Sequence, residues 1–292
     1  MLNYPQPAAG LWRLTEWHYD APRLLDWTKG VLDLGINVLD LADVYGDYEV
    51  EPRFGTAMAL DPALRERLFL ITKCDIKLVS GKRPQHRIKH YDTSRAHITA
   101  SVENSLRQLR TDRIDLLLIH RPDPLMDADQ TAEAFVALKQ SGKVLHFGVS
   151  NFTPSQFELL ASRLPFPLVT NQVEFSPLQL DPMYDGTFDQ CQRLRVSPMA
   201  WSPFAGGTLF HDDGEAARRV RDALRSVAEE LGGLTLDQAA LAWILTHPAR
   251  VVPVLGTSRL DNIAKAVQIR DTRLSREQWF SVLAAAQGHE VP

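Results

Sequence analysis

The sequence predicts a single-domain α/β fold, a (β/α)8 barrel (TIM barrel) that spans the whole chain, residues 1–292. Short apolar runs alternate eight times with segments of helical periodicity, and the connections are mainly short. The apolar runs lack strict alternation, which is typical of parallel strands covered by helices. A barrel of this kind needs about 250 residues. No Gly-x-Gly-x-x-Gly pattern follows a run, which argues against an open dinucleotide-binding sheet.

The eight expected strands are short, and each is followed by a helical segment. By residue number the strands are 8–14, 38–40, 68–73, 114–120, 143–150, 169–174, 197–202 and 251–256. The helical segments are 21–34, 51–60, 93–109, 131–141, 154–163, 186–194, 216–231, 235–246, a helix from 259 onward and 275–287.

Capping residues place several helix ends. Asp20 is expected to cap the first helix, because its side chain can accept a hydrogen bond from a free backbone N–H, and Gly35 is expected to end that helix. Asp92 is the expected cap of the 93–109 helix, and Gly142 ends the 131–141 helix. Two helices open on a capping box, formed by Thr153 with Gln156 and by Ser275 with Gln278.

Two stretches lack clear periodicity. Residues 75–92 are basic and polar, and we expect a long loop at one rim of the barrel. Residues 205–207, which read Ala-Gly-Gly, are expected to open a flexible loop.

Composition argues against several classes of function. The chain has 45% hydrophobic and 23% charged residues, as ordinary globular proteins do. Its formal net charge of −4 provides no basic field, so nucleic acid is not an expected partner. No signal peptide or apolar membrane span is recognisable. The two cysteines, Cys74 and Cys191, form no metal-binding motif. We therefore expect a cytoplasmic protein that has no metal site and does not contact a membrane.

Four polar residues stand at or just after the ends of three expected strands. Asp40 ends one run and is followed by Tyr45, Lys73 ends a second run, and His120 ends a third. The carboxyl ends of barrel strands meet at one rim, where barrel enzymes place catalytic groups. Each residue alone has a structural alternative, such as a helix cap, an internal ion pair or a satisfied rim histidine. Those alternatives would have to hold for all four.

The four residue types suit the reduction of a carbonyl group. Hydride addition leaves an alkoxide, which needs a proton donor within hydrogen-bonding reach. A free tyrosine, with a pKa near ~10, is a weak acid at neutral pH, and an adjacent ammonium is expected to lower that pKa. We assign Tyr45 as general acid, Lys73 as its modulator, Asp40 as the partner of Lys73 and His120 as the group that orients the substrate oxygen.

Six motifs occur in order along the chain: Asp40-x-Ala42-x-x-Tyr45-Gly46, Thr72-Lys73, Leu117-Leu118-Ile119-His120, Gly148-Val149-Ser150-Asn151-Phe152, Asn171-Gln172-Val173-Glu174 and Gly256-Thr257-Ser258. This ordered set resembles the aldo/keto reductase superfamily, in particular its bacterial branch of general oxidoreductases. The resemblance covers essentially the whole chain. It implies a barrel fold, a nicotinamide cofactor, a small-molecule carbonyl substrate, and a monomer or weak oligomer.

The resemblance also implies a set of cofactor-binding residues. Ser150, Asn151 and Gln172 offer the donors and acceptors that a carboxamide needs, and Trp201 offers a flat face for the nicotinamide ring. The family usually has a tyrosine at that position, so Trp201 keeps the stacking surface but lacks the hydroxyl. The other expected contacts are Gly10, Leu11, Trp12, Ser202, Phe204, Gly256, Thr257, Ser258, Arg259 and Asn262.

The expected helix that begins near Arg259 bears on the choice of nucleotide. Free backbone N–H groups at its start, together with the guanidinium of Arg259, suit a 2′-phosphate. NADPH is therefore the expected cofactor, and NADH remains an alternative, because the family's lysine-containing phosphate motif is absent. Asn262 is the candidate adenine contact.

The expected substrate pocket lies beside the nicotinamide. We expect its walls to come from Trp12, Trp17, His18, Tyr48 and the 75–92 loop. Aromatic and apolar walls favour an aldehyde or ketone with hydrophobic bulk.

Two other functions remain open from the sequence. A nicotinamide-binding sensor or regulatory subunit would keep the fold and the cofactor without turnover. A barrel glycosidase would use strand-end carboxylates such as Asp40 and Glu174, but it leaves Tyr45, Lys73 and His120 without roles.

Overall fold

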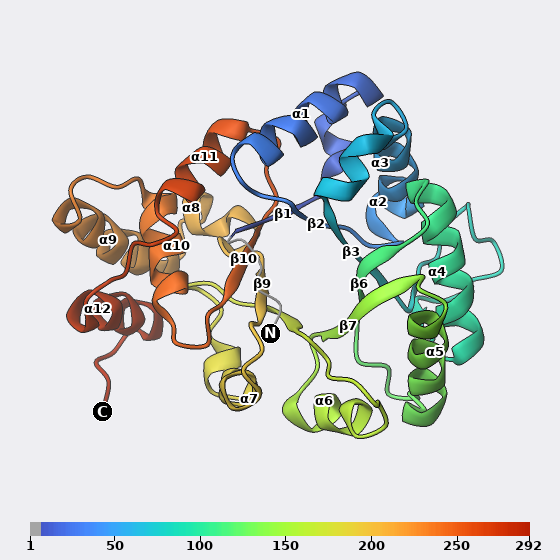
Figure 1. The fold of residues 1–292 in the computed structure, drawn as a ribbon. Helices are drawn as coiled ribbons and strands as arrows, with labels where there is room; N and C mark the ends of the chain where they lie inside the picture. Colours follow the sequence, from blue (N-terminus) through green and yellow to red (C-terminus); the bar gives the residue numbers. More distant parts are fainter. Residues whose placement is uncertain (1–6) are drawn as a thin grey trace.

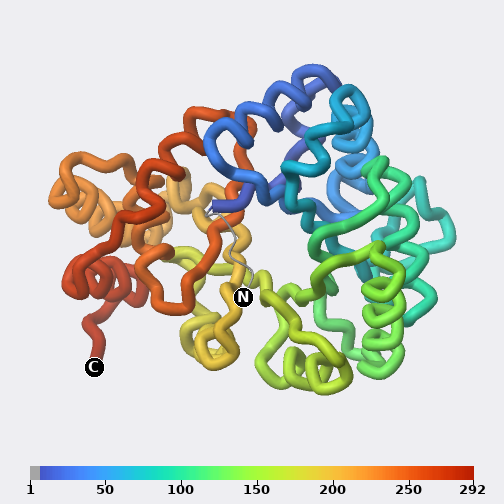
Figure 2. The backbone as a smooth tube through the Cα atoms, viewed as in Figure 1, coloured from blue at the N-terminus to red at the C-terminus, as the bar shows by residue number. Residues whose placement is uncertain are grey.

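The computed structural model describes residues 7–292 and shows eight parallel strands closed into a barrel and surrounded by helices (Figure 1). The barrel strands are β1 (Ala8–Gly10), β2 (Val38–Asp40), β3 (Phe69–Cys74), β6 (Ile114–Ile119), β7 (Val144–Ser150), β8 (Asn171–Glu174), β9 (Met199–Trp201) and β10 (Val252–Leu255). Their order around the barrel is β1-β10-β9-β8-β7-β6-β3-β2. Figure 2 shows the blue start of the chain beside the red strand that closes the barrel, where Ala8 pairs with Val254. The prediction of a (β/α)8 barrel is confirmed.

The helices form the outer layer (Figure 1). They are α1 (Ala21–Asp33), α2 (Tyr45–Tyr48), α3 (Val50–Met58), α4 (Arg95–Leu109), α5 (Ala128–Gln140), α6 (Pro154–Ala161), α7 (Thr187–Leu194), α8 (Thr208–His211), α9 (Glu215–Glu230), α10 (Leu236–Thr246), α11 (Leu260–Gln268) and α12 (Arg276–Gln287). Within residues 7–292, four short 3-10 turns each lie between a strand and a helix: η1 (Leu14–Trp17), η2 (Pro62–Arg67), η3 (Asp181–Met183) and η4 (Ala205–Gly207). Across residues 7–292, none of these helices combines the length and apolarity needed to cross a membrane.

Most of the predicted helix ends are confirmed. The Asp20 carboxylate accepts a hydrogen bond from the backbone N–H of Arg23 at 2.9 Å, and Gly35 follows α1 with a positive φ of 83°. Both predicted capping boxes are present. Asp92 is not the cap of α4. Ser94 is the cap, and Asp92 instead accepts a hydrogen bond from the backbone N–H of Ser94 and pairs with Lys77.

Several predicted boundaries differ from the structure. The first strand ends at Gly10, because the chain turns there into η1. The 75–92 segment contains a small antiparallel hairpin, β4 (Ile76–Lys77) with β5 (His90–Tyr91), rather than only a loop. Helix α5 begins three residues earlier than predicted, because Asp127 caps it. The 205–207 segment forms η4 and leads directly into α8.

The barrel interior is filled by apolar side chains from alternate strand positions. They are Ala8, Val38, Ile71, Leu116, Leu118, Met199, Val252 and Val254. Side chains along a strand alternate between its two faces. Asp40 and Lys73 follow Val38 and Ile71 by two residues, and His120 follows Leu118 by two. The pleat therefore directs these three polar side chains toward the barrel axis, one layer above the apolar filling.

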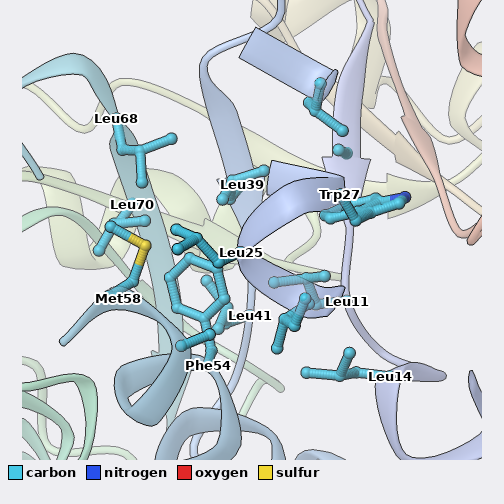
Figure 3. Close-up of a cluster of buried hydrophobic side chains, with 14 of the residues drawn as sticks. Leu11, Leu14, Leu25, Trp27, Leu39, Leu41, Phe54, Met58, Leu68 and Leu70 are labelled. Carbon is cyan, nitrogen blue, oxygen red and sulfur yellow. The ribbon is translucent and has the colours of Figure 1, made fainter. Parts of the chain in front are cut away.

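The residues on the outer strand faces pack against the helices. Figure 3 shows one such cluster, in which Leu11, Leu39 and Leu70 from the strand side meet Trp27 of α1 and Phe54 of α3. Burial of each large side chain contributes roughly 1.5–3 kcal/mol to the free energy of unfolding. This packing holds the strand ends in fixed relative positions.

Candidate active site

A pocket of about 580 Å³ opens at the carboxyl end of the barrel. Every barrel strand supplies at least one lining residue from its end or from the connection that follows it. Examples, in chain order from β1 to β10, are Gly10, Asp40, Ile76, His120, Ser150, Gln172, Trp201 and Gly256. At Gly10 an added Cβ would lie only 2.9 Å from a methyl group of Val254, so the Val254 side chain would have to shift to make room for a larger residue.

The predicted group of Asp40, Tyr45, Lys73 and His120 comes together at this pocket. The Lys73 ammonium donates hydrogen bonds to both Asp40 carboxylate oxygens at 2.8 Å each and to the Tyr45 hydroxyl oxygen at 3.0 Å. It also donates to the backbone carbonyl of Leu41 at 2.8 Å. The side chains of Lys73 and Asp40 are 0% and 4% exposed, so this is a buried ion pair with its hydrogen bonds satisfied.

The local electrostatics keep Lys73 charged. Burial by itself lowers the pKa of Lys73, but the Asp40 carboxylate and the Tyr45 oxygen outweigh that effect and raise the pKa above its ordinary value. The ammonium therefore persists at neutral pH and presents a fixed positive charge to Tyr45.

The pKa of Tyr45 differs from the prediction. Burial raises this pKa above its ordinary value of 10.0, and the positive charge of Lys73 lowers it by less. The expectation that Lys73 leaves Tyr45 with a lowered pKa is therefore wrong for this structure, because the loss of solvent around the hydroxyl is the larger effect. Tyr45 therefore holds its proton at neutral pH.

His120 packs against Tyr45 with its ring edge-on, the ring centroids being 5.6 Å apart. Burial, followed by the positive charges of Lys73, Arg121 and Lys89, holds the pKa of His120 well below its ordinary value of 6.5. Its Nδ1 atom is buried and has no hydrogen-bond partner within residues 7–292. The ring is thus a neutral polar group that faces Tyr45.

Ser150 and Asn151, at the end of β7, form a polar wall of the pocket. The Ser150 hydroxyl donates to the backbone carbonyl of Gln172 at 2.7 Å, and the Asn151 amide donates to the Ser150 hydroxyl oxygen at 2.8 Å. The Trp201 indole N–H donates to the Asn151 amide oxygen at 2.9 Å. Asn151 adopts a positive φ of 60°, a backbone conformation that Asn tolerates better than most residues.

Gln172 links this wall to the buried ion pair. Its amide nitrogen donates to an Asp40 carboxylate oxygen at 2.8 Å. Its amide oxygen accepts no hydrogen bond from residues 7–292, and Gln172 lines the pocket. Asp40 is therefore held from two sides, by Lys73 and by Gln172.

Most of the predicted cofactor residues line the pocket. They are Gly10, Trp12, Ser150, Asn151, Gln172, Trp201, Ser202, Phe204 and Gly256. Leu11 does not. Its side chain is fully buried on the outer side of the barrel, beside Leu25 and Trp27 (Figure 3), because the pleat turns it away from the axis. The link between Leu11 and the site residues is its backbone N–H, which donates a hydrogen bond to the backbone carbonyl of Asp40 at 2.9 Å.

The other predicted residues after β10, which are Thr257, Ser258, Arg259 and Asn262, lie around the start of α11 and outside the pocket lining. The Thr257 hydroxyl oxygen accepts hydrogen bonds from the backbone N–H of Arg259 at 3.2 Å and from the Asn262 amide at 3.4 Å. The carbonyl of Ser258 accepts one from the Tyr19 hydroxyl at 3.3 Å. Arg259 is exposed, and its guanidinium forms no hydrogen bond or ion pair with the described part of the chain.

The expected substrate walls are only partly correct. Trp12 lines the pocket and is 56% exposed. Tyr48 does not line it, and its hydroxyl oxygen accepts a hydrogen bond from the backbone N–H of Leu78 at 3.0 Å. Trp17 packs against Tyr19 and Trp27 instead, and His18 is exposed outside the pocket. The 75–92 segment contributes three lining residues, Ile76, Leu78 and Lys89.

Two arginines in the pocket lining were not predicted. Arg13 donates a hydrogen bond to the carbonyl of Gly206 at 3.0 Å and so connects the segment after β1 with η4. Arg121 directly follows His120, and its guanidinium carbon lies 5.6 Å from the centre of the Trp201 ring. Arg121 could have been predicted from the sequence, because it directly follows His120 at the end of a strand, and residues next to a rim residue can reach the same pocket.

Comparison with known proteins identifies the family. The model of the aldo/keto reductase family matches residues 8–286. This chain belongs to the aldo/keto reductase family. The oxidoreductase YdhF of Escherichia coli is 50% identical over 283 residues, which are 97% of this chain and 94% of that protein. The 6-dehydroglucose reductase of Agrobacterium fabrum is 43% identical over 283 residues, with the same coverage.

A solved structure agrees with this assignment. An aldo/keto reductase from Klebsiella pneumoniae, in complex with NADP and acetate, superposes with a TM-score of 0.78 at 25% identity, and the match covers 99% of this chain and 93% of that one. As an aldo/keto reductase, the protein is an oxidoreductase. The glycosidase alternative has no support, because Lys73 and Gln172 already occupy the Asp40 carboxylate.

Proposed function

We propose that this aldo/keto reductase reduces an aldehyde or ketone to the alcohol with NADPH, and that Tyr45 is the general acid. The observation that carries the proposal is the 3.0 Å contact between the Lys73 ammonium and the Tyr45 hydroxyl at a pocket. Two similar proteins support it. The relative from Agrobacterium fabrum is named a 6-dehydroglucose reductase, and the structure from Klebsiella pneumoniae contains NADP.

The residues on the pocket wall fit a nicotinamide. NADPH, when bound, supplies a hydride from its nicotinamide ring. The amide and hydroxyl groups of Ser150, Asn151 and Gln172 would hold the carboxamide, and the Gln172 amide oxygen accepts no hydrogen bond from residues 7–292. The nicotinamide ring would stack on the Trp201 indole, which is fixed in place by its hydrogen bond to Asn151.

Tyr45 supplies the proton. As hydride adds to the carbonyl carbon, negative charge develops on the oxygen, and the Tyr45 hydroxyl donates its proton to that oxygen. The nearby ammonium of Lys73 stabilises the tyrosinate that remains, and both Asp40 oxygens hold the ammonium in place. His120, neutral and facing Tyr45, orients the substrate oxygen.

The start of α11 favours NADPH over NADH. Thr257 fixes the first turn of this segment, and Arg259 lies exposed beside it with its guanidinium uncommitted to other described residues. A guanidinium next to free backbone N–H groups is well suited to a phosphate. In our proposal Arg259 binds the 2′-phosphate and Asn262 lies beside the adenine.

The direct test is a binding titration followed by an activity assay. Quenching of protein fluorescence measures the Kd for NADPH and NADH, and absorbance at 340 nm measures NADPH oxidation with aldehydes, ketones and diketones. We expect a Kd of about 1 μM, which corresponds to about −8 kcal/mol, together with carbonyl-dependent oxidation. Tight binding with no turnover on any carbonyl compound would instead support a sensor. Absence of nucleotide binding would refute the proposal.

A further inference from the structure

Some of the charged residues that line the pocket have a hydrogen-bond or ion-pair partner, and others have none in the described part of the chain. Arg13, Lys89 and Arg121 line it as cations, and Asp40 and Asp47 line it as anions. The Asp40 carboxylate is committed to Lys73, and Arg13 is bonded to the carbonyl of Gly206. The charges in the described lining that have no ion-pair or hydrogen-bond partner are those of Lys89 and Arg121, which are positive, and the Asp47 carboxylate, so two cations outnumber one anion.

Arg121 is held in place without using its guanidinium in a hydrogen bond. Its backbone N–H donates to the Asp75 carboxylate at 3.1 Å, which fixes the main chain just after His120. Its guanidinium forms no hydrogen bond or ion pair with residues 7–292 and lies 5.6 Å from the centre of the Trp201 ring. Glu174 is near enough to feel its charge, but the two form no ion pair. An arginine with all its donors available in a pocket is suited to a bidentate oxyanion.

Lys89 provides a second charge on the same side. It lies in the connection between β4 and β5, is exposed, and has no ion-pair partner in the described chain. Both Lys89 and Arg121 line the same pocket as His120, and their positive charges contribute to the lowered pKa of that ring. Two cations therefore share the pocket in which the proposed mechanism places the reacting carbonyl group.

These two cations are separate from the residues proposed to hold the cofactor phosphates. Arg121 follows β6 and Lys89 follows β3, whereas η4 follows β9 and Arg259 follows β10. In the barrel order, β6 and β3 lie opposite β10 and β9, as Figure 1 shows. Lys89 and the main chain of Arg121 thus lie on the side of Tyr45 and His120, where the substrate would be bound, and the Arg121 guanidinium lies 5.6 Å from the centre of the Trp201 ring.

We propose that Arg121 and Lys89 form a subsite for an oxyanion of the substrate, and that the substrate is a carbonyl compound carrying a carboxylate or phosphate. This inference rests on the proposed carbonyl reduction. It replaces the sequence-based expectation of a substrate with hydrophobic bulk. The apolar lining residues Ile76 and Leu78 would then contact only the carbon chain between the carbonyl and the anion.

Matched pairs of substrates test the subsite. Succinic semialdehyde and its methyl ester differ by one negative charge on the same chain, and glyceraldehyde 3-phosphate and glyceraldehyde differ by a phosphate. Glyceraldehyde and propanal form a neutral pair that differs only in hydroxyl groups. For each pair the readout is the ratio of kcat/KM values, because effects of a mutation on nucleotide binding or on the chemical step cancel in that ratio.

Three variants are compared with the wild type. Arg121→Gln removes the guanidinium, Arg121→Lys retains a charge, and Lys89→Gln removes the second cation. Arg87→Gln is the matched control, because Arg87 is exposed, lies two residues before Lys89 in the 75–92 segment and does not line the pocket. We expect the ratio for one charged pair to fall about tenfold or more in Arg121→Gln and about threefold in Lys89→Gln. Arg121→Lys should recover part of the loss, and Arg87→Gln should match the wild type.

The pair whose ratio falls distinguishes a carboxylate from a phosphate substrate. Unchanged ratios for both charged pairs in Arg121→Gln and Lys89→Gln would overturn the subsite. A fall confined to the neutral glyceraldehyde pair would also overturn it and would assign the two cations to sugar hydroxyl groups instead.

A binding measurement separates failure of the subsite from failure of the proposed function. Isothermal titration of the protein, with and without NADP+, compares 4-hydroxybutyrate with neutral 4-hydroxybutyramide. Preferential binding of the acid that weakens about tenfold in Arg121→Gln supports the subsite even if no carbonyl compound is reduced. Equal binding of the acid and the amide, or no binding of either, would count against it.

Discussion

The ammonium nitrogen of Lys73 lies 3.0 Å from the hydroxyl oxygen of Tyr45. Lys73 lies in β3, and Tyr45 follows β2. The Asp40 carboxylate accepts hydrogen bonds from the Lys73 ammonium through both of its oxygens and so fixes the position of the lysine. The contact gives Tyr45 a permanent positive neighbour, although burial still leaves its pKa above the ordinary value. Tyr45 therefore keeps its proton at neutral pH, as the proposed role of general acid requires.

The first prediction concerns the proton donor. Tyr45→Phe removes the hydroxyl while keeping the ring that packs against His120. We expect kcat for carbonyl reduction to fall by ~10²–10⁴-fold, because a positioned general acid contributes about that much, while the Kd for NADPH changes less than about twofold. The 340 nm assay and a fluorescence titration measure the two quantities. Turnover at the wild-type rate would remove Tyr45 from the mechanism.

The second prediction concerns the buried ion pair. Lys73→Met leaves the Asp40 carboxylate without its cation, and Asp40→Asn leaves Lys73 without its anion. Each change is expected to lower the free energy of unfolding by about 3–5 kcal/mol, and the double variant should lose less than the sum, because neither charge is then stranded. Urea unfolding of all four proteins measures this coupling.

An exposed pair provides the control for that cycle. Arg95 and Glu133 form an ion pair whose side chains are 58% and 60% exposed. Their double-mutant cycle should give a coupling of about 0–1 kcal/mol. Equal coupling in the two pairs would show that the buried pair has no special energetic role.

The third prediction concerns the pH dependence of catalysis. Because the pKa of Tyr45 lies above 10.0 and that of His120 lies well below 6.5, neither group changes its charge between pH 7 and 9. We expect kcat/KM for reduction to be flat over that range. Oxidation of the alcohol needs the tyrosinate, so its rate should rise about tenfold per pH unit up to the pKa of Tyr45. A bell-shaped reduction profile centred near pH 7 would contradict these assignments.

The fourth prediction concerns a buried acid outside the pocket. Burial raises the pKa of Asp43 from 3.8 to about 8, and its Oδ1 atom is buried without a hydrogen-bond partner within residues 7–292. The folded state therefore binds a proton that the unfolded state releases above about pH 4. The resulting stabilisation is complete below pH 3.8 and is lost as pH rises through about 8.

The test of this linkage is Asp43→Asn, which keeps an oxygen available for the hydrogen bond from Ser101. The free energy of unfolding of the wild type should fall between pH 5 and 7, and the variant should reduce that fall by roughly 1–3 kcal/mol. Urea unfolding at both pH values measures the difference. Asp33→Asn, at an exposed position of α1, should leave the fall unchanged. If Asp43→Asn behaves like this control, the buried carboxyl does not titrate as described.

The fifth prediction concerns the choice of nucleotide. Arg259→Ala removes the exposed guanidinium at the start of α11. We expect the Kd for NADPH to rise about tenfold or more, and the Kd for NADH to change little, because only NADPH carries the 2′-phosphate. Fluorescence titrations with both nucleotides measure the two constants. Equal losses would mean that Arg259 is only a surface cation.

The barrel and the grouping of the four polar residues at one rim were predictable from the sequence for a simple reason. Parallel strands deliver all of their carboxyl ends to one rim, so polar residues at several strand ends must meet there. Asp40, Lys73 and His120 needed only that rule and the family resemblance. Helix caps such as Asp20 and Ser275 were equally accessible, because their hydrogen bonds are local.

The features that were missed depend on distant contacts. The direction of the Leu11 side chain follows from the pleat of β1, which is set by pairing with β2 and β10. The hairpin within 75–92 depends on the pairing of Ile76 with Tyr91. The raised pKa of Tyr45 results from burial, which raises it, and the charge of Lys73, which lowers it by less. The sequence identifies both residues but does not show how deeply the Tyr45 hydroxyl is buried. Arg121 was missed because the sequence does not show that its guanidinium is left without a hydrogen-bond or ion-pair partner in the described part of the chain.

Isotope transfer tests the central claim most directly. NADPH carrying deuterium at both positions of nicotinamide C4 is incubated with the protein and a carbonyl compound, and mass spectrometry determines the label in the product alcohol. The account predicts one deuterium on the carbinol carbon with the wild type and none above background with Tyr45→Phe. Product without deuterium, or labelled product formed equally fast by Tyr45→Phe, would contradict hydride transfer assisted by Tyr45.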